Sequence, residues 1–252
     1  MTKNSIKRAN VLIAGGAKNL GGLIARDFAK EGASGVLIHY NSDSSKAAAD
    51  DTVKDLSNYD VKVVTVQSDL TKVEECSKLF ARAKKEFGSL DIAINTVGMV
   101  LKKPLTETTE AEYDQMFAVN SKSAYFFLKE AANTLNDGGK ICTIVTSLLG
   151  AFTGLYSTYA GSKAAVDHFT RAAAKELGPR GISVTAVAPG PMDTPFFYGQ
   201  ETPDAVAYHK SASALGGLTD IKDIAPLIKF LVTDGWWITG QTIFANGGYT
   251  TR

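Results

Sequence analysis

The chain has 252 residues, of which 44% are hydrophobic and 21% charged, and this is enough for one sizeable core in a single domain. Its 27 lysines and arginines nearly balance its 26 aspartates and glutamates, which excludes the strongly basic surface typical of nucleic-acid binders and of proteins that dock on anionic membranes. We therefore expect neither nucleic acid nor membrane as a partner.

The first apolar run, Val11–Ala14, is stopped by Gly15 and Gly16 and is far too short for a signal-peptide core or a membrane span. Cys76 and Cys142 form neither a C-x-x-C pair nor a metal-ligand cluster, and the 3 histidines share no ligand spacing. These features predict a cytoplasmic protein with reduced thiols and no metal site.

Short apolar runs rich in valine, isoleucine and threonine alternate with amphipathic stretches along the chain. The runs predict strands at Val11–Ala14, Val36–His39, Val61–Val66, Ile92–Asn95, Lys140–Thr146, Ser183–Ala188 and Thr242–Phe244. The helical stripes between them are Leu20/Ile24/Phe28, Val73/Cys76/Phe80, a long stretch from Tyr113 to Phe127, Ala164–Leu177 and Ile224–Leu231. This alternation predicts an α/β domain with a doubly wound, seven-stranded parallel sheet and helices on both faces.

The segment Pro191–Gly217 is the least periodic part of the chain, and we expect a lid or a binding loop there. With Leu148–Thr158 it should border a substrate pocket past the carboxyl ends of the strands. The aromatic residues of these segments predict either an apolar, flat substrate or the packing of a lid on the body. They are Phe152, Tyr156, Phe196, Phe197 and Tyr198.

A glycine-rich turn joins the first strand to the first helix, and such a turn lets the backbone approach a pyrophosphate at a helix N-terminus. The turn reads Gly15-Gly16-Ala17-Lys18-Asn19-Leu20-Gly21-Gly22. The next strand ends in His39-Tyr40-Asn41-Ser42, with no carboxylate before Asp43 to hold the ribose of NAD. Because Lys18 offers a cation for a 2′-phosphate, the pattern favours NADP(H).

Tyr159 and Lys163 are four residues apart in Tyr-Ala-Gly-Ser-Lys and would share one face of a helix. A cation ~4 Å from the phenol, at an effective dielectric constant of ~20, contributes roughly 4 kcal/mol. The spacing therefore predicts a lowered pKa for Tyr159, in the range that suits proton transfer at cellular pH.

The ordered set of motifs resembles the short-chain dehydrogenase/reductase family over nearly the whole chain. The glycine turn resembles T-G-x-x-x-G-x-G, with Ala14 for the threonine and Asn19 for the central glycine, and asparagine tolerates positive φ. The other motifs are Asp69 in Ser-Asp-Leu, Asn95-Thr96-Val97-Gly98 for N-N-A-G, Asn120, Ser147 before Tyr159-x-x-x-Lys163, Pro189-Gly190-x-x-x-Thr194, and Thr239-Gly240-Gln241 with Asn246-Gly247-Gly248.

The resemblance implies one Rossmann domain over residues 1–252, with dinucleotide binding mainly in 9–100 and the catalytic residues and substrate loop in 140–217. The implied catalytic residues are Asn120, Ser147, Tyr159 and Lys163, with Thr146 as a second candidate for the serine role. The implied cofactor-binding residues are Gly15, Lys18, Asn19, Leu20, Gly21, Tyr40, Asn41, Ser42, Asp69, Leu70, Asn95, Gly98, Tyr159, Lys163, Pro189, Gly190, Met192 and Thr194.

In this scheme Tyr159 would protonate the carbonyl oxygen and Ser147 would hydrogen-bond to it. Lys163 would lower the pKa of the phenol and bind the nicotinamide ribose, and Asn120 would hold a water next to Lys163.

The resemblance also implies a reaction and an assembly. The reaction is NADPH-dependent hydride transfer to a ketone or ketoester. The alternatives are reduction of 3-oxoacyl thioesters or pteridines, NAD-linked oxidation of alcohols or polyols, and a nucleotide-sensing regulator without turnover. The assembly is a homotetramer, paired through helices around Glu112–Asn133 and Tyr159–Leu177 and through the region of Trp236, Trp237 and Phe244.

Overall fold

The strands of the chain form one parallel sheet in the order β3-β2-β1-β4-β5-β6-β7, in a computed structural model that describes residues 4–151 and 153–251. The strands are β1 (Asn10–Ala14), β2 (Gly35–Tyr40), β3 (Lys62–Gln67), β4 (Ile92–Asn95), β5 (Lys140–Ile144), β6 (Ser183–Pro189) and β7 (Thr242–Ala245). The strand order reverses between β1 and β4, as in a doubly wound Rossmann fold. The predicted fold class is confirmed, and each predicted strand overlaps an observed one. The predicted pocket residue Phe152 lies outside the described residues.

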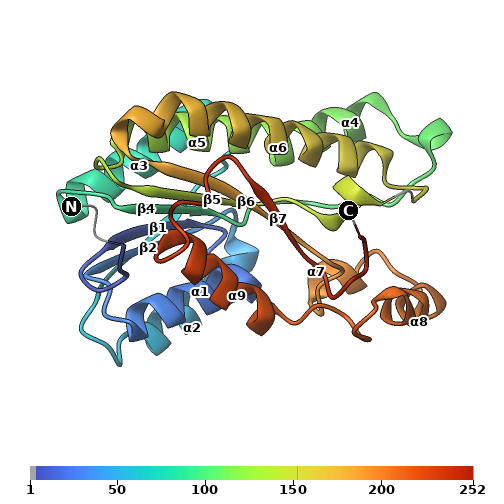
Figure 1. Ribbon diagram of the computed structural model, residues 1–252, viewed down its shortest axis with the longest axis horizontal. Coiled ribbons are helices and arrows are strands. Elements are labelled where there is room, and N and C mark those ends of the chain that lie inside the picture. Colours follow the sequence, from blue (N-terminus) through green and yellow to red (C-terminus); the bar gives the residue numbers. More distant parts are fainter. Residues whose placement is uncertain (1–3, 152, 252) are drawn as a thin grey trace.

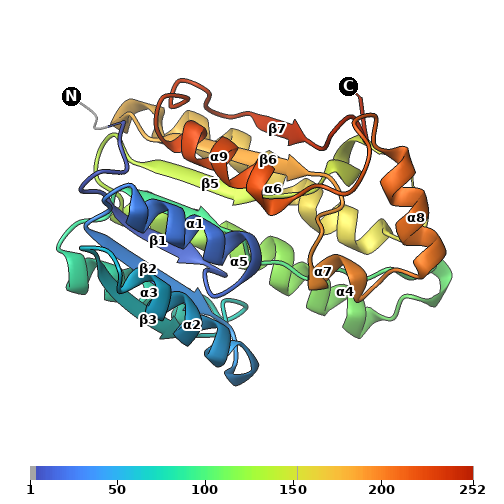
Figure 2. The same ribbon diagram turned by 90° about the horizontal axis from the view of Figure 1, so that it is seen from below.

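Helices cover both faces of the sheet (Figures 1 and 2). On one face lie α1 (Asn19–Lys30), α2 (Lys46–Leu56) and α9 (Ile221–Val232); on the other lie α3 (Val73–Phe87), α5 (Ser123–Thr134) and α6 (Ser157–Leu177). Because both faces are covered, the central strands are buried on both sides, which explains their continuous apolar runs. Phe28 on α1 packs in the first core layer, and the rings of Phe80 and Phe127 meet edge to face at 5.0 Å in the second.

The predicted long helix from Tyr113 to Phe127 is present, with a break in its hydrogen-bond pattern. It consists of α4 (Glu110–Phe117), a π-helical turn at Ala118–Lys122, and α5. The π-helical turn brings Asn120 and Ser121 against α6. Asn120 Nδ2 donates to Ser162 Oγ at 3.0 Å, and Ser121 Oγ donates to the Ser162 carbonyl at 2.7 Å.

The segment 191–217 is more ordered than the expected loop, because it contains α7 (Pro195–Tyr198) and α8 (Pro203–Ala212). Each begins with a proline, and the Thr202 hydroxyl caps α8 by accepting a hydrogen bond from the Ala205 amide at 3.3 Å. The sequence lacked helical periodicity here because α8 buries only His209. Both helices lie beyond the carboxyl ends of the strands (Figure 2).

Candidate active site

A cavity of about 570 Å³ runs along the carboxyl ends of the strands, from the glycine turn past α6 to α7 and α8. All the predicted site residues line it except Ser42, Asn95 and Asn120. Ser42 Oγ pairs with Ser44 Oγ at 2.9 Å, and Ser45 lines the cavity instead. The fold therefore brings most of the predicted cofactor and catalytic residues to one hollow.

The glycine turn is packed too tightly for side chains at three of its positions, Gly15, Gly16 and Gly21. A Cβ on Gly15 would lie 2.5 Å from Thr96 Oγ1, and one on Gly21 would lie 2.3 Å from the Gly15 carbonyl oxygen. Thr96 fits below the turn by donating its hydroxyl hydrogen to the Ala14 carbonyl at 2.9 Å. Asn19 has φ 50°, so the expectation that asparagine takes the left-handed position of a glycine is confirmed.

The N-terminus of α1 fits a phosphate-bearing cofactor. Its N-cap residue, Lys18, makes no side-chain cap, and the first turn holds no acidic residue. The amide groups and the positive end of the helix dipole are therefore left to an anion from outside the helix. Lys18 is exposed at the cavity and has no ion-pair partner in the described part of the chain. These features fit the pyrophosphate and the 2′-phosphate of NADP(H).

His39 ties the glycine turn to the neighbouring strand ends, a role that the sequence did not indicate. Its Nδ1 accepts from the Gly15 amide at 3.2 Å, and its Nε2 pairs with the Ser68 carbonyl at 2.8 Å. Burial lowers the pKa of His39 to about 4, so the ring is neutral and Nε2 carries the hydrogen. His39 thus positions the backbone that faces the cavity.

Asp69 is held at the edge of the cavity by the residues that follow it. Its Oδ1 accepts from the Thr71 amide at 3.0 Å and from the Thr71 hydroxyl at 2.7 Å. Burial raises its pKa, but the hydrogen bonds from Thr71 outweigh this and leave the pKa below its usual value. Asp69 is therefore an ionised acceptor at neutral pH, which suits the cofactor-binding role implied by the family resemblance.

Asn95 and Asn120 act on backbone rather than on the cavity. Asn95 is 1% exposed, and its Oδ1 accepts from the Val97 amide at 3.0 Å, which shapes the turn after β4. Asn120 Oδ1 accepts from the Met99 amide at 2.9 Å, and its Nδ2 donates to the Met99 carbonyl at 2.9 Å. Both asparagines fix the chain between β4 and α4, beside the cavity.

Tyr159 and Lys163 lie on one face of α6, as the spacing predicts, and both are buried and line the cavity. The Lys163 ammonium donates to the Ile144 carbonyl at 2.9 Å and to the Val97 carbonyl at 3.3 Å. Burial lowers the pKa of Lys163 to about 8 and raises that of Tyr159 to about 12. The expected lowering of the Tyr159 pKa by Lys163 is not met, because desolvation dominates and the ammonium is directed at backbone carbonyls.

Thr146 and Ser147 both present hydroxyls to the cavity at the end of β5. The Thr146 hydroxyl opposes the rise of the phenol's pKa, and it also accepts from the Leu148 amide at 3.3 Å. Ser147 is 1% exposed and begins a single helical turn, Ser147–Gly150. The structure therefore pairs the phenol with Thr146, the second candidate, whereas the substrate role of Ser147 stays a prediction.

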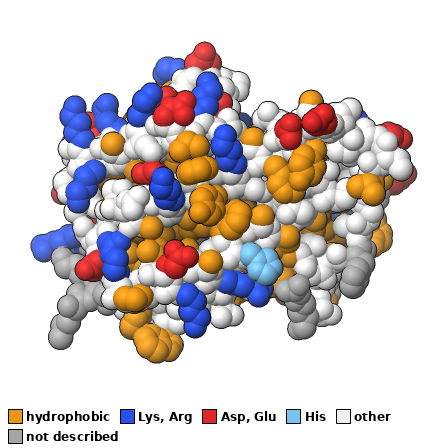
Figure 3. Space-filling model, turned by 90° about the horizontal axis from the view of Figure 1, so that it is seen from above, with side chains coloured by type: hydrophobic (Ala, Val, Ile, Leu, Met, Phe, Trp, Pro, Cys, Tyr) orange, Lys and Arg blue, Asp and Glu red, His pale blue; other side chains and the backbone are white. Residues whose placement is uncertain are grey.

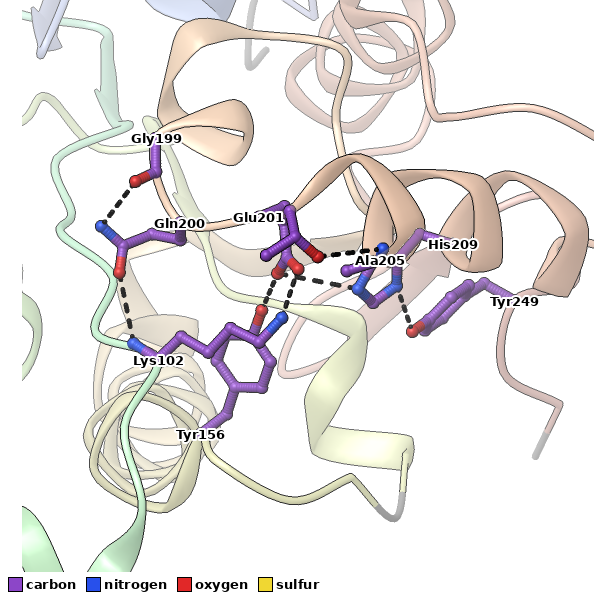
Figure 4. Close-up of polar contacts among 9 residues, drawn as sticks. Lys102, Tyr156, Gly199, Gln200, Glu201, Ala205, His209 and Tyr249 are labelled. Atoms are coloured by element: carbon purple, nitrogen blue, oxygen red, sulfur yellow. Dashed lines mark hydrogen bonds and ion pairs between the residues drawn. The ribbon is translucent and has the colours of Figure 1, made fainter.

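The far end of the cavity carries a polar cluster that the sequence did not reveal (Figure 4). Glu201, between α7 and α8, has a side chain only 1% exposed and contacts Lys102 and the Tyr156 hydroxyl. His209 Nε2 lies 3.6 Å from Glu201 Oε1, and His209 Nδ1 lies 2.8 Å from the Tyr249 hydroxyl. An isolated charge in a loop gives no sequence signal of burial, so only the fold could identify this cluster.

Within residues 4–151 and 153–251, no three His, Cys, Asp or Glu side chains gather as metal ligands. No helix in those ranges is both long and apolar enough to cross a bilayer.

Comparison with known proteins places the chain in a family. The family model described as enoyl-(acyl carrier protein) reductase matches residues 15–250. The hydroxynaphthalene reductase-like protein Arp2 of Metarhizium brunneum is 34% identical over 271 residues, which cover 99% of this chain and 98% of that protein.

Two solved structures are similar to this chain over nearly its whole length. A structure described as a dehydrogenase from Burkholderia cenocepacia with bound NADP is 64% identical, with a TM-score of 0.97 over 99% of this chain and 96% of that one. A short-chain dehydrogenase from Oenococcus oeni is 53% identical, with a TM-score of 0.79 over 100% of both chains. With its motifs, sheet order and cavity, the chain belongs to the short-chain dehydrogenase/reductase family and is an NAD(P)-dependent oxidoreductase.

Proposed function

We propose that this chain is an NADPH-dependent carbonyl reductase that acts on ketones or ketoesters. The observation that carries the proposal is a buried phenol, Tyr159, in the same cavity as the glycine turn and the Thr146 hydroxyl, on one helix face with Lys163. A phenol in this setting can deliver a proton to an oxygen that gains negative charge beside a hydride donor.

The cofactor, when bound, supplies the hydride for the carbonyl carbon. Tyr159 donates its hydroxyl proton to the carbonyl oxygen, and a pKa of about 12 keeps the phenol protonated at neutral pH. Ser147 donates a second hydrogen bond that orients this oxygen. Lys163, with a pKa of about 8, is a nearby reserve of protons. Asn120 does not hold the expected water, because its amide is engaged with Met99 and Ser162; it positions the chain beside Lys163 instead.

The choice of NADP(H) rests on the residues around the glycine turn. Lys18 is exposed at the cavity, and Tyr40, Asn41 and Ser45 line the same end without a carboxylate that would repel a 2′-phosphate. The relative from Burkholderia cenocepacia, at 64% identity, was crystallised with NADP. Residues 9–100 then mainly bind the dinucleotide, with Asp69, Leu70 and Gly98 along it, and residues 140–217 hold the catalytic residues and the substrate loop.

We also propose a cytoplasmic homotetramer. Cys76 and Cys142 are buried thiols whose pKa burial raises to about 12, which suits reduced, unreactive cysteines. One interface of the tetramer would form on the face covered by α4, α5 and α6. There apolar side chains gather between charged ones (Figure 3). These side chains include Tyr113, Phe117, Tyr125, Phe126 and Phe169.

The test is the oxidation of NADPH and of NADH, followed by the absorbance of the reduced nicotinamide, with a panel of ketones, ketoesters, a 3-oxoacyl thioester and a pterin. We expect turnover of ketones or ketoesters, with NADPH preferred at least about tenfold in kcat/KM. Preference for NADH would overturn the cofactor assignment. Absence of turnover across the panel would favour a nucleotide-sensing regulator instead.

A further inference from the structure

Glu201 is a buried carboxylate in the wall of the substrate end of the cavity, although the proposed chemistry does not use it. Figure 4 shows it at the centre of a cluster drawn from separate parts of the chain: Lys102 before α4, Tyr156 before α6, His209 on α8 and Tyr249 after β7. A carboxylate whose side chain is only 1% exposed is costly unless it is paired, and here Lys102 balances its charge. The cluster is therefore neutral overall and rigidly held.

The donor and the acceptor of each hydrogen bond in the cluster follow from the chemistry of the groups. A carboxylate only accepts, so the Tyr156 hydroxyl donates to Glu201, and the His209 nitrogen that faces Glu201 carries the hydrogen. Burial lowers the pKa of His209, so the ring is neutral and its other nitrogen, Nδ1, must accept. Tyr249 therefore donates its hydroxyl hydrogen to His209 across the 2.8 Å contact.

The two phenols at the ends of this network each already donate their single hydroxyl hydrogen within it. Tyr156 and Tyr249 each retain oxygen lone pairs, and both line the cavity. Because each donates toward Glu201, directly or through His209, each oxygen is a stronger acceptor than a free phenol oxygen. Burial raises the pKa of both phenols, so neither becomes a phenolate at neutral pH.

The acceptor end lies next to the proton donor. The rings of Tyr156 and Tyr159 are 6.3 Å apart, centroid to centroid, and Met116 packs in the same buried cluster. A substrate whose carbonyl oxygen reaches the Tyr159 hydroxyl thus has its neighbouring atoms close to Tyr156. A group there gains a hydrogen bond only if it is a donor, and an acceptor-only group meets lone pairs.

We propose that Tyr156, oriented by Glu201, forms a recognition site for a substrate hydroxyl on the carbon next to the reacting carbonyl, so that the substrates are α-hydroxyketones. The proposal rests on the proposed carbonyl reduction and names its substrate class. It disfavours α-keto acids, since a carboxylate carries no donor and would sit beside Glu201. It also disfavours a plain alkyl group, which would leave the Tyr156 oxygen without a donor.

The experiment measures binding to the enzyme saturated with NADP+, in which hydride transfer to a ketone cannot occur. Calorimetric titrations use phenacyl alcohol, its methyl ether and phenylglyoxylate, which share the aryl ketone but offer a donor, only an acceptor, and a carboxylate. We expect phenacyl alcohol to bind about tenfold more tightly than the methyl ether, as for one hydrogen bond lost from a buried site. Phenylglyoxylate should bind more weakly still.

Two variants and a control assign the effect to the cluster. Tyr156→Phe removes the acceptor, and Glu201→Gln removes the charge that orients it; each should reduce the ratio between phenacyl alcohol and its methyl ether to about threefold or less. Tyr208→Phe, a tyrosine on the same helix that is 65% exposed, should keep the wild-type ratio. Thermal unfolding midpoints establish that each variant is folded.

Equal affinities for the alcohol and the ether in the wild type, or an unchanged ratio in both variants, would overturn the proposal. The two proposals fail differently. Selective binding of phenacyl alcohol without NADPH oxidation would refute the carbonyl reductase and leave the hydroxyl site standing. Turnover of ketones without selective binding of phenacyl alcohol would support the carbonyl reductase and refute the hydroxyl site.

Discussion

Tyr159 combines two opposing effects at the scale of the single residue. Burial makes the phenol a weaker acid, with a pKa of about 12, while the Thr146 hydroxyl lowers that pKa. A protonated phenol suits reduction, in which it gives up a proton only as the carbonyl oxygen becomes basic. Lys163, whose pKa falls to about 8, supports this side of the reaction as a proton reserve.

We predict that Tyr159→Phe lowers kcat by about 10³-fold, because the general acid is lost. NADPH binding should stay within about threefold of wild type, since the phenyl ring keeps the packing against Tyr156. Steady-state kinetics and a fluorescence titration of NADPH check the two parts. A variant that keeps activity within a few-fold of wild type would rule out the assigned proton donor.

We predict different effects for the two hydroxyls beside the phenol. Thr146→Val removes the hydroxyl that lowers the Tyr159 pKa, so the rising limb of the pH profile for alcohol oxidation should move to higher pH. Ser147→Ala should instead lower kcat about 10²-fold and leave that limb in place. Measurements of kcat against pH for both variants distinguish them. A shift of the limb in Ser147→Ala alone would exchange the two roles.

The sequence predicted those site residues whose role depends on the conformation of the backbone around them. Asn19 could be recognised because the turn requires a left-handed residue, and the spacing of Tyr159 and Lys163 follows from helix geometry. Glu201 and His209 could not be recognised, because their burial depends on contacts with Lys102 and Tyr249, which lie far away in the sequence. Local patterns do not contain such long-range partners.

At the scale of the elements, His39 joins the end of β2 to the glycine turn and to Ser68 after β3. Its pKa of about 4 in the folded chain lies below the 6.5 of an ordinary histidine. Between these values the unfolded chain binds a proton that the folded chain does not, so stability is lost as the pH falls through this window. The shift corresponds to about 3 kcal/mol.

We predict that the free energy of unfolding, measured with urea, decreases by up to about 3 kcal/mol between pH 7 and pH 4 on account of His39. His39→Asn should be less stable at pH 7 and should show a flatter pH dependence. The control, His168→Asn, replaces an exposed histidine and should keep the wild-type slope. Equal slopes in His39→Asn and wild type would contradict this assignment.

The elements differ in how far the sequence determines them. The buried strands were recognisable because of their continuous apolar runs, as in β1 and β4. The π-helical turn at Ala118–Lys122 was not, since it inserts a residue without altering the helical composition around it. Helix α8 was missed because it is largely solvent-exposed, and only Pro203 and the Thr202 cap mark its start.

At the scale of the whole molecule, the cavity and the exposed apolar surfaces lie on different parts of the domain. The cavity is at the carboxyl edge of the sheet, and the apolar patch is on the outer face of α4, α5 and α6. Tyr125 is 50% exposed there and packs edge to face on Phe169 at 5.1 Å. Trp237, near the C-terminal end of the chain, is 80% exposed. Aromatic rings this exposed in a monomer favour burial between subunits.

We predict that size-exclusion chromatography with light scattering will show a tetramer. A charge placed on either of the two apolar surfaces should remove the interface that this surface forms. Tyr125→Glu should give dimers, because a buried charge at the α4–α6 interface has no partner. Trp237→Glu should also give dimers, through loss of the other interface, and the double variant should be a monomer. Tyr59→Glu, at a tyrosine that is 40% exposed outside both surfaces, should stay tetrameric. Since all three side chains are exposed in the protomer, each variant should fold, and a tetramer in the double variant would refute both assigned interfaces.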